Sequence, residues 1–462
     1  MNRQLRLNKW ILISLVSIYA YDLLFWLFSG YGGYEKGYED SIGGAGSTQG
    51  GTPIVVSIDY FFVLIWISIF CCLYLLSKIS WRNNIPKRAY YLYMLLLLCN
   101  LICFIRGGVS ASGYFDIKNL FAEAGGGLSQ FAPVILVTAM SIPSATKIFK
   151  TLITILKGSL ILIPFQIIRA LATEESYAQI VIPVTMLLLL APYLPYKKKI
   201  LIFVVAAASF FLTIEWRTNE LRLILLFLFL MLISFRKITT NAVYNFINII
   251  LLCTPIVLMI TGVVTGKTIF QEASGHNQKT EVIASGQQVD LQGDTRTYLY
   301  LEVLSDLTAS NALLFGKGAS GKYKSDFFTE SAYKKGRGNV EVGALKILLY
   351  SGITGLLLTL LVLCTAIYYG TNRSNNTLTK FFAFFLALHW MLLFVENMVS
   401  YNIYYYILWF VTGLCLSKNF RQLSNSDIKS FFAKHKPKRL NERQASHSSP
   451  HQKRLPVHSG LA

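Results

Sequence analysis

Charged residues are scarce in this chain. Asp, Glu, Lys and Arg make up 14% of its 462 residues, whereas 54% are hydrophobic. The hydrophobic residues form blocks about as long as a bilayer is thick, a composition that excludes an ordinary set of soluble domains. Because a backbone inside a bilayer must satisfy its own hydrogen bonds, we predict that these blocks are helices.

Cysteine is missing from the long polar segments. All seven cysteines fall inside apolar blocks, and none has the spacing to histidine that a zinc site requires. We interpret them as small buried hydrophobic residues. The sequence also has no Asp-rich motif, so we predict neither a metal site nor a cofactor. The seven are Cys71, Cys72, Cys99, Cys103, Cys253, Cys364 and Cys415.

Acidic residues are also few, 23 against 43 basic ones, which gives a net charge of +20. Much of the excess lies in the N-terminal segment, in alternate connectors between the apolar blocks, and in the C-terminal tail. The positive-inside rule of membrane proteins explains this distribution, so we predict no nucleic-acid partner.

About twelve apolar blocks of bilayer length predict an all-α, polytopic transmembrane helix bundle with both termini in the cytoplasm. Nine spans are expected in residues 1–265 and three in residues 341–418. Between them, residues 266–340 form one large outside (periplasmic) loop between spans 9 and 10. The polar, basic residues 419–462 are predicted to be a disordered cytoplasmic tail.

The fifth span is the least regular, because Lys157 interrupts its apolar block. Either Lys157 faces the interior of the bundle, or residues 145–157 lie along the membrane interface and the span begins later. A lysine at mid-membrane is costly, which favours the second interpretation.

The large loop holds nine Lys/Arg and eight Asp/Glu residues. Its basic residues gather late, beside the start of the tenth span, where a positive patch would suit a phosphate or diphosphate head group. The alternative is a solvated loop surface with incidental lysines. The late basic residues are Lys317, Lys322, Lys324, Lys334, Lys335 and Arg337.

Two features of the loop precede this patch. RTYLYLEVLSDLTAS, which starts at Arg296, predicts an amphipathic helix packed on the bundle or the interface. LLFGKGASG predicts a tight turn whose exposed backbone amides would hold an anion. The apolar face of the predicted helix consists of Tyr300, Val303, Leu304 and Leu307.

Arginines are also found where topology disfavours them. Arg217 and Arg222 lie in an outside turn, and Arg222 directly precedes LILLFLFLML. We predict that they are fixed cations for a diphosphate, joined by Arg169 and Arg106 from neighbouring outside ends. The alternative is an arginine at a helix end that pairs with the glutamates of its own turn.

Glu341 lies where the loop enters the tenth span. A carboxylate there is expected to be partly desolvated, which raises its pKa toward the range of a general base. The alternative is a glutamate that complements the helix dipole, and spacing alone favours it. Five polar residues inside apolar blocks are interpreted as interhelical hydrogen-bonding groups: Asp59, Asn100, Gln166, His389 and Glu396.

Three local patterns, between about residues 215 and 370, carry a family resemblance. They are an outside turn with arginine that enters an apolar helix (EWRTNELRLILLFLFL), an arginine-led amphipathic helix that ends in a Phe-Gly turn (RTYLYLEVLSDLTASNALLFGKG), and a loop-to-helix junction (EVGALKILLYSGITG). With them the chain resembles the O-antigen polymerase/ligase family of bacterial membrane glycosyltransferases, which includes the Wzy-type polymerases. The junction pattern rests on Glu341, Leu345, Gly352 and Gly355.

The resemblance implies the polymerisation of glycan repeat units carried on undecaprenyl pyrophosphate, at the outer face of the bacterial inner membrane. It implies inverting glycosyl transfer without nucleotide sugar, metal or cofactor. The implied partners are the undecaprenyl-pyrophosphate-linked glycan and membrane lipids, with room for a chain-length regulator. The implied pyrophosphate-binding residues are Arg217, Arg222, Arg296, Arg169 and Arg337, with Glu341 as the catalytic base.

Two other functions stay open. An O-antigen ligase would transfer the finished polymer to lipid A core, but that branch usually has His-Asn at the junction, where this chain has Glu341 and Val342. A lipid-linked oligosaccharide flippase or transporter would need charged or broken helices at mid-membrane. Here the charges gather at the outer ends of the predicted spans, which favours the polymerase.

Overall fold

The structure of the protein is a computed structural model. It describes residues 2–29, 61–78, 81–155, 187–212, 217–234, 240–265, 280–282, 288–290, 295–325, 336–338 and 340–432.

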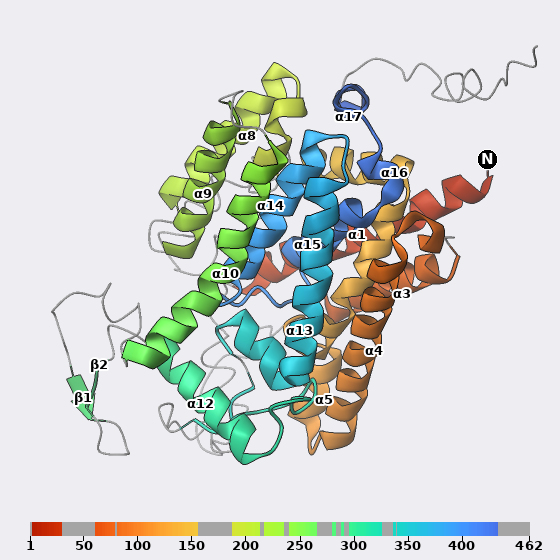
Figure 1. Ribbon diagram of the computed structural model, residues 1–462. Coiled ribbons are helices and arrows are strands. Elements are labelled where there is room, and N and C mark those ends of the chain that lie inside the picture. Colours follow the sequence, from red (N-terminus) through yellow and green to blue (C-terminus); the bar gives the residue numbers. More distant parts are fainter. Residues whose placement is uncertain are drawn as a thin grey trace, which may run out of the picture.

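Helices make up most of the described chain, and they are gathered in one bundle (Figure 1). Two three-residue strands, β1 (Thr280–Val282) and β2 (Gln288–Asp290), pair antiparallel inside the large loop. The α-helices are α1 (Asn2–Ser29), α3 (Phe62–Lys78), α4 (Lys87–Ser110), α5 (Tyr114–Phe121), α8 (Tyr196–Leu212), α9 (Arg217–Ser234), α10 (Asn241–Thr265), α12 (Thr295–Ala309), α13 (Gly343–Asn372), α14 (Thr377–Leu392), α15 (Ile403–Leu416), α16 (Lys418–Arg421) and α17 (Asn425–Phe432), with 3-10 segments η2 (Trp81–Asn84), η3 (Gly127–Met140) and η4 (Ala191–Tyr193).

Within the described residues, four helices are long and apolar enough to cross a membrane. The number of candidate spans rises to five if η3 and the helix Ile142–Ile155 that follows it are taken as one broken span. The protein is therefore a membrane-embedded helical bundle, while the number of twelve spans stays a prediction. The four helices are Arg6–Leu24, Lys87–Ser110, Asn241–Leu258 and Gly343–Asn372.

Helix Ile142–Ile155 leaves η3 at a bend of 114°. Its Ile148, Phe149 and Leu152 are buried in the core, so it packs on the bundle and does not continue the direction of η3. Whether the fifth span begins later stays a prediction, because residues 156–186 lie outside the described part. Lys157 lies outside the described residues, and a position at the interface stays a prediction.

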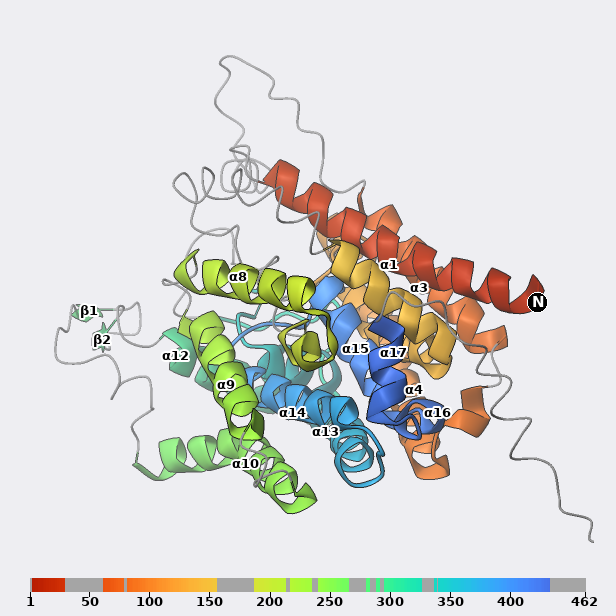
Figure 2. The same ribbon diagram turned by 90° about the horizontal axis from the view of Figure 1, so that it is seen from above.

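The centre of the bundle is α15. Every residue of this helix is buried, because an apolar surface on all sides lets it pack in every direction. Next to it lie α13 and α14, with α3 and α4 on one side and α8, α9 and α10 on the other (Figure 1 and Figure 2). The outer helix α4 keeps an exposed apolar face, as expected for a helix that borders lipid.

The segments that the sequence predicts on the same side of the membrane do meet one another. At one end of the bundle Tyr401 N–H donates to Ala124 O, and Gly343 N–H donates to Glu396 O. At the opposite end Asn84 Nδ2 donates to the Ser417 hydroxyl at 2.9 Å. Helices α5 and α12 lie at the first end, and α16 and α17 at the other (Figure 1). The prediction that successive connectors lie at alternate ends of the bundle is thus consistent with the fold. The assignment of one end to the cytoplasm stays a prediction.

The beginning of the C-terminal tail differs from the prediction. The start of the predicted tail forms the short helices α16 (Lys418–Arg421) and α17 (Asn425–Phe432) rather than a disordered segment. Ile428 and Phe432, one helical turn apart, are buried against the bundle, and the ring of Phe432 lies 5.9 Å from that of Phe149. This contact orders the start of the tail. It was not predicted because the tail as a whole has few hydrophobic residues. Residues 433–462 lie outside the described part.

Helix α13 is broken at Gly352. There φ is 68° and ψ is −169°, a backbone conformation that is essentially restricted to glycine. A break exposes backbone hydrogen-bonding groups, which must find partners when the surroundings are apolar. The break lies nine residues after Gly343, the first residue of α13.

The loop of residues 311–321 fills the break. Two loop amides donate to carbonyls of the first half of α13, and two amides of the second half donate to loop carbonyls. The loop therefore replaces the hydrogen bonds that the helix loses. The four bonds are Lys317 N to Leu349 O (2.7 Å), Gly318 N to Tyr350 O (2.9 Å), Ile353 N to Leu313 O (2.9 Å) and Thr354 N to Leu314 O (3.1 Å).

Candidate functional site at one end of the bundle

The connection between α14 and α15, residues 393–402, joins several elements of the predicted site. The first amides of α13 donate to it, from Gly343 to Glu396 O at 3.1 Å and from Ala344 to Leu393 O at 2.9 Å. The Tyr300 hydroxyl of α12 donates to Phe394 O at 2.7 Å. The amphipathic helix and the start of the tenth predicted span are therefore held at the same short segment.

Helix α9 reaches this connection through Arg222. Its Nη2 donates to a carboxylate oxygen of Glu396 at 2.6 Å, and the guanidinium lies 5.5 Å from the centre of the Tyr404 ring. Only 1% of the Arg222 side chain is exposed, against 16% for Glu396. Arg222 is therefore not a cation open to a ligand, and one of its partners, Glu396, lies in a distant part of the chain.

The buried polar contacts continue inward from Arg222. The Tyr404 hydroxyl lies 2.9 Å from Nδ1 of His389, which is buried in α14. Glu396, Arg222, Tyr404 and His389 thus form a chain of contacts that reaches the surface at Glu396. The interhelical role predicted for His389 and Glu396 is confirmed. The sequence analysis missed Tyr404, although the run of three tyrosines at the start of an apolar block (Tyr404, Tyr405 and Tyr406) was a visible signal.

Glu341 lies directly before α13 and accepts a hydrogen bond from Arg337 Nη2 at 2.8 Å. Its side chain is 49% exposed, so it is not the desolvated carboxylate that the sequence predicted. The reason is that the connection 393–402 covers the first turn of α13 but leaves Glu341 outside it. The backbone of Arg337 is fixed by an antiparallel bridge to Tyr323. Tyr323 is buried, and this burial raises the pKa of its hydroxyl to about 12.

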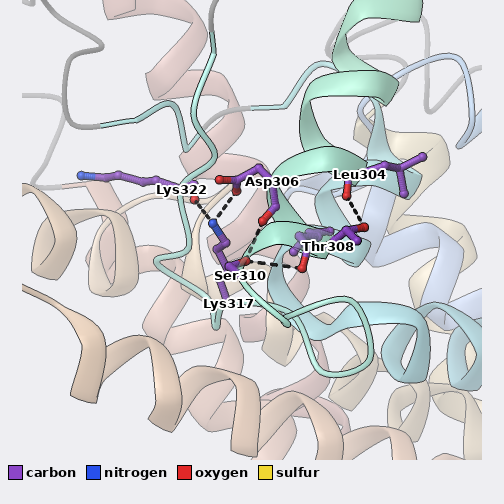
Figure 3. Close-up of polar contacts among 7 residues, drawn as sticks. Leu304, Asp306, Thr308, Ser310, Lys317 and Lys322 are labelled. Carbon is purple, nitrogen blue, oxygen red and sulfur yellow. Dashed lines mark hydrogen bonds and ion pairs between the residues drawn. The ribbon is translucent and has the colours of Figure 1, made fainter.

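Two lysines of the predicted positive patch are paired with carboxylates from other elements. Lys317 Nζ contacts Asp306 of α12 and also donates to Lys322 O at 3.2 Å (Figure 3). Lys322 Nζ lies 2.6 Å from a carboxylate oxygen of Asp116 in α5. The patch is therefore less positive than the sequence suggested, because the fold brings acidic groups from α5 and α12 to it. Lys334 and Lys335 lie outside the described residues.

Asp116 is the acidic partner that the sequence analysis overlooked. Burial acts to raise the pKa of this carboxyl, but hydrogen bonds from Lys322 and from Ser112 outweigh the burial and hold the pKa below its ordinary value. The Ser112 amide and hydroxyl each donate to Asp116 Oδ2 at 3.0 Å. The carboxylate is therefore ionised at neutral pH and fixes α5 against the loop.

The glycine-rich turn LLFGKGASG uses the amides of residues 316–319 within the protein, so these four are not open to an anion as predicted. The amides of Lys317, Gly318 and Ala319 all donate to protein carbonyls, in α13 and at Cys103 of α4. Arg106, predicted to join the cation cluster, instead donates to the carbonyls of Phe315 (2.6 Å) and Gly316 (2.9 Å). The turn is a structural junction between α4 and α13.

The other predicted cations are described only in part. Arg169 lies outside the described residues. Arg217 is the first residue of α9 and Arg296 the second of α12, but their side chains also lie outside the description. The structure brings their helices to the connection 393–402 through Arg222 and Tyr300. A direct meeting of the three arginines stays a prediction.

Over the same described ranges, no group of three His, Cys, Asp or Glu side chains could hold a metal ion. Comparison of the chain with protein-family models, with curated proteins and with solved structures gives no match.

Proposed function

We propose that this protein is a membrane glycosyltransferase that polymerises oligosaccharide repeat units carried on undecaprenyl pyrophosphate, at the outer face of the bacterial inner membrane. One observation supports the proposal most. The three segments that carry the family resemblance are far apart in sequence, yet α9, α12 and α13 all bond to the connection 393–402. Segments that build one site are expected to converge in this way.

In the proposed reaction, an acceptor sugar hydroxyl attacks the anomeric carbon of the lipid-linked glycan. The new glycosidic bond forms as the bond from that carbon to the diphosphate oxygen breaks, and the diphosphate leaves with the electron pair. A carboxylate takes the hydroxyl proton. Diphosphate is a good leaving group, so positioning and charge stabilisation carry most of the catalysis.

The residue roles follow from exposure. We propose Glu341, which is half exposed at the start of α13, as the base that accepts the proton. Arg337 was predicted to be a diphosphate ligand, but its side chain is 12% exposed and lies 2.8 Å from Glu341, so we reassign it to orienting this carboxylate. Arg169, Arg217 and Arg296 stay the proposed diphosphate ligands. Arg222 is too deeply buried to touch a substrate in this conformation, so we assign it to holding the connection 393–402 in place.

The broken helix α13 favours a second candidate, a transporter of lipid-linked oligosaccharide. Transporters use the backbone groups freed at such breaks to bind substrate. Here the amides of Ile353 and Thr354 and the carbonyls of Leu349 and Tyr350 are bonded to the loop 311–321. These groups are therefore not available to a substrate in this conformation, which makes the transporter the weaker proposal.

The surface glycan of a deletion strain tests the proposal. Loss of a polymerase leaves single repeat units on the cell surface, loss of a ligase leaves no surface glycan, and loss of a flippase leaves lipid-linked glycan in the cytoplasm. A deletion strain with an unchanged ladder of chain lengths would contradict all three. Restoring the ladder with the wild-type gene but not with Arg217→Ala or Arg296→Ala would assign these arginines to the site. Lys418→Ala, at the opposite end of the bundle, is the matched control and should restore the ladder.

A further inference from the structure

The loop 311–321 carries an exposed apolar tip formed by Leu314 and Phe315. Their relative exposures are 60% and 62%, although the backbone that carries them is fixed. The Leu314 carbonyl accepts hydrogen bonds from the amide and the hydroxyl of Thr354, and the Phe315 carbonyl accepts one from Arg106. Two large apolar side chains are therefore held outward in a defined place, which marks an interaction surface.

The tip lies beside exposed apolar residues of two neighbouring helices. On α4, the exposed residues Ile102 and Ile105 precede Arg106, which binds the tip. On α13, Leu357 and Leu361 are exposed and follow Thr354 on the same helical face. Helices α4 and α13 pack side by side (Figure 1), and the tip is bonded to both of them through Arg106 and Thr354.

Two independent counts give the depth of the tip in the membrane. A helix needs about 20 residues to cross the hydrocarbon layer. Counted from Arg88 in the first turn of α4, this length ends at Gly108, two residues after Arg106. The helix α13 is followed by Arg373, and about 20 residues back lead to Ile353, next to Thr354. Both counts put the tip at the far edge of the hydrocarbon layer, as measured from the end that holds α16 and α17.

The backbone carbonyls of the tip are bonded within the protein. An irregular segment can enter a membrane only if its polar groups find partners in the protein. The carbonyls of residues 313–316 and the amides of residues 316–319 all have such partners. Four of these bonds also fill the break at Gly352, so the break and the tip share a set of contacts.

From these observations we infer that Leu314 and Phe315 insert into the edge of the hydrocarbon layer and pack against the acyl chains of bilayer lipids. Lipid is the occupant because the tip is bonded to α4 and α13 beside their exposed apolar residues, and these residues border lipid in a membrane-embedded bundle. Both helix counts also place the two side chains at the edge of the hydrocarbon layer, where they can reach the acyl chains.

Photocrosslinking tests the inference. Benzoylphenylalanine is placed at position 315 or, in a second variant, at 314, and the full-length protein is reconstituted in nanodiscs of palmitoyl-oleoyl phosphatidylethanolamine and phosphatidylglycerol. After irradiation, intact-protein mass spectrometry should show a mass increase of one phospholipid at both positions. Position 102 on α4 is the positive control, and position 324, an exposed lysine beyond the turn, is the control expected to lack the adduct.

Each outcome is decisive. Lipid adducts at 102, 314 and 315 but not at 324 support the inference. Adducts at 102 alone would overturn it, as would a crosslinked dimer band from 315, which would make a second copy of the chain the occupant. Because 314 and 315 are exposed, both variants should elute from size-exclusion chromatography as the wild type does. The experiment needs no enzymatic activity, so it is independent of the proposed function.

Discussion

Arg222 and Glu396 are 174 residues apart in sequence, yet their side chains are joined by a hydrogen bond of 2.6 Å between Nη2 and a carboxylate oxygen. The bond links α9 to the connection that also receives α12 and α13. The arginine is almost fully buried, and the glutamate is mostly buried, so each charge depends on the other for compensation. This pair is the main electrostatic tie across the predicted site.

Removing one member of the pair should destabilise the protein strongly. For Arg222→Met or Glu396→Gln alone, we expect a loss of about 3 to 5 kcal/mol in the free energy of unfolding, because a buried charge is left without compensation. The double variant Arg222→Met/Glu396→Met should recover most of that loss. Thermal unfolding of the purified protein in detergent measures the difference.

The pair formed by Arg337 and Glu341 is the matched control, since Glu341 is 49% exposed. Exposed ion pairs contribute at most about 1 kcal/mol, so Glu341→Gln should leave thermal unfolding almost unchanged. If Arg222→Met unfolds at the same temperature as the wild type, the pair does not tie the helices together.

Gly352 should be irreplaceable by alanine. A Cβ atom at this position would lie 2.4 Å from the carbonyl carbon and oxygen of Leu314, and φ is +68°. We expect Gly352→Ala to cost about 3 kcal/mol, because alanine strongly disfavours this backbone conformation. Unfolding in detergent is again the measurement. Gly108→Ala on α4 is the control, since its nearest neighbour, a methyl of Leu120, is at an ordinary distance of 3.5 Å.

The stabilisation that comes from the contact between Lys322 and Asp116 should be lost in strong acid. The pKa of Asp116 in the folded protein is below its ordinary value of 3.8, so the contact contributes to stability above pH 3.8 and loses that contribution as the pH falls through the folded pKa. Unfolding temperatures of the wild type and of Asp116→Asn should therefore differ at neutral pH and converge in strong acid. A constant difference down to strong acid would show that ionisation of Asp116 is not the cause.

Glu341→Gln separates catalysis from structure. If Glu341 is the base of the proposed reaction, this variant should accumulate at wild-type level in the membrane but fail to extend glycan chains in the deletion strain. Glutamine keeps the size of the side chain and accepts no proton, so a structural defect is not expected. A normal glycan ladder would instead assign Glu341 to its contact with Arg337 and to the helix dipole.

The helices themselves were predictable. The apolar blocks of residues 89–105, 246–264 and 345–369 lie inside α4, α10 and α13, each of which extends at most five residues beyond its block. The amphipathic helix from Arg296 was also correct, with Leu299, Val303 and Leu307 fully buried. Both results follow from local causes. The length of an apolar block and the spacing of its residues decide where a helix forms in a bilayer.

The break in α13 was not predictable by the same reasoning. The block at 345–369 is mostly apolar, with Lys346 as its one charged residue, and a glycine such as Gly352 is common in membrane helices. The break forms because the loop 311–321 supplies the backbone partners that an interrupted helix needs, and that loop is distant in sequence.

The sequence by itself determined that this is a membrane-embedded helical protein, the order of its helices and the segments expected to share an end of the bundle. Only the tertiary structure decided which charges meet. Arg222 pairs with Glu396 and Lys322 with Asp116, and the amides of the glycine-rich turn bond to α4 and α13 rather than remaining open to an anion. The physical reason is that helix formation in a membrane depends on neighbours along the chain, whereas the partner of a charge or of a freed backbone group depends on which distant segments pack against it.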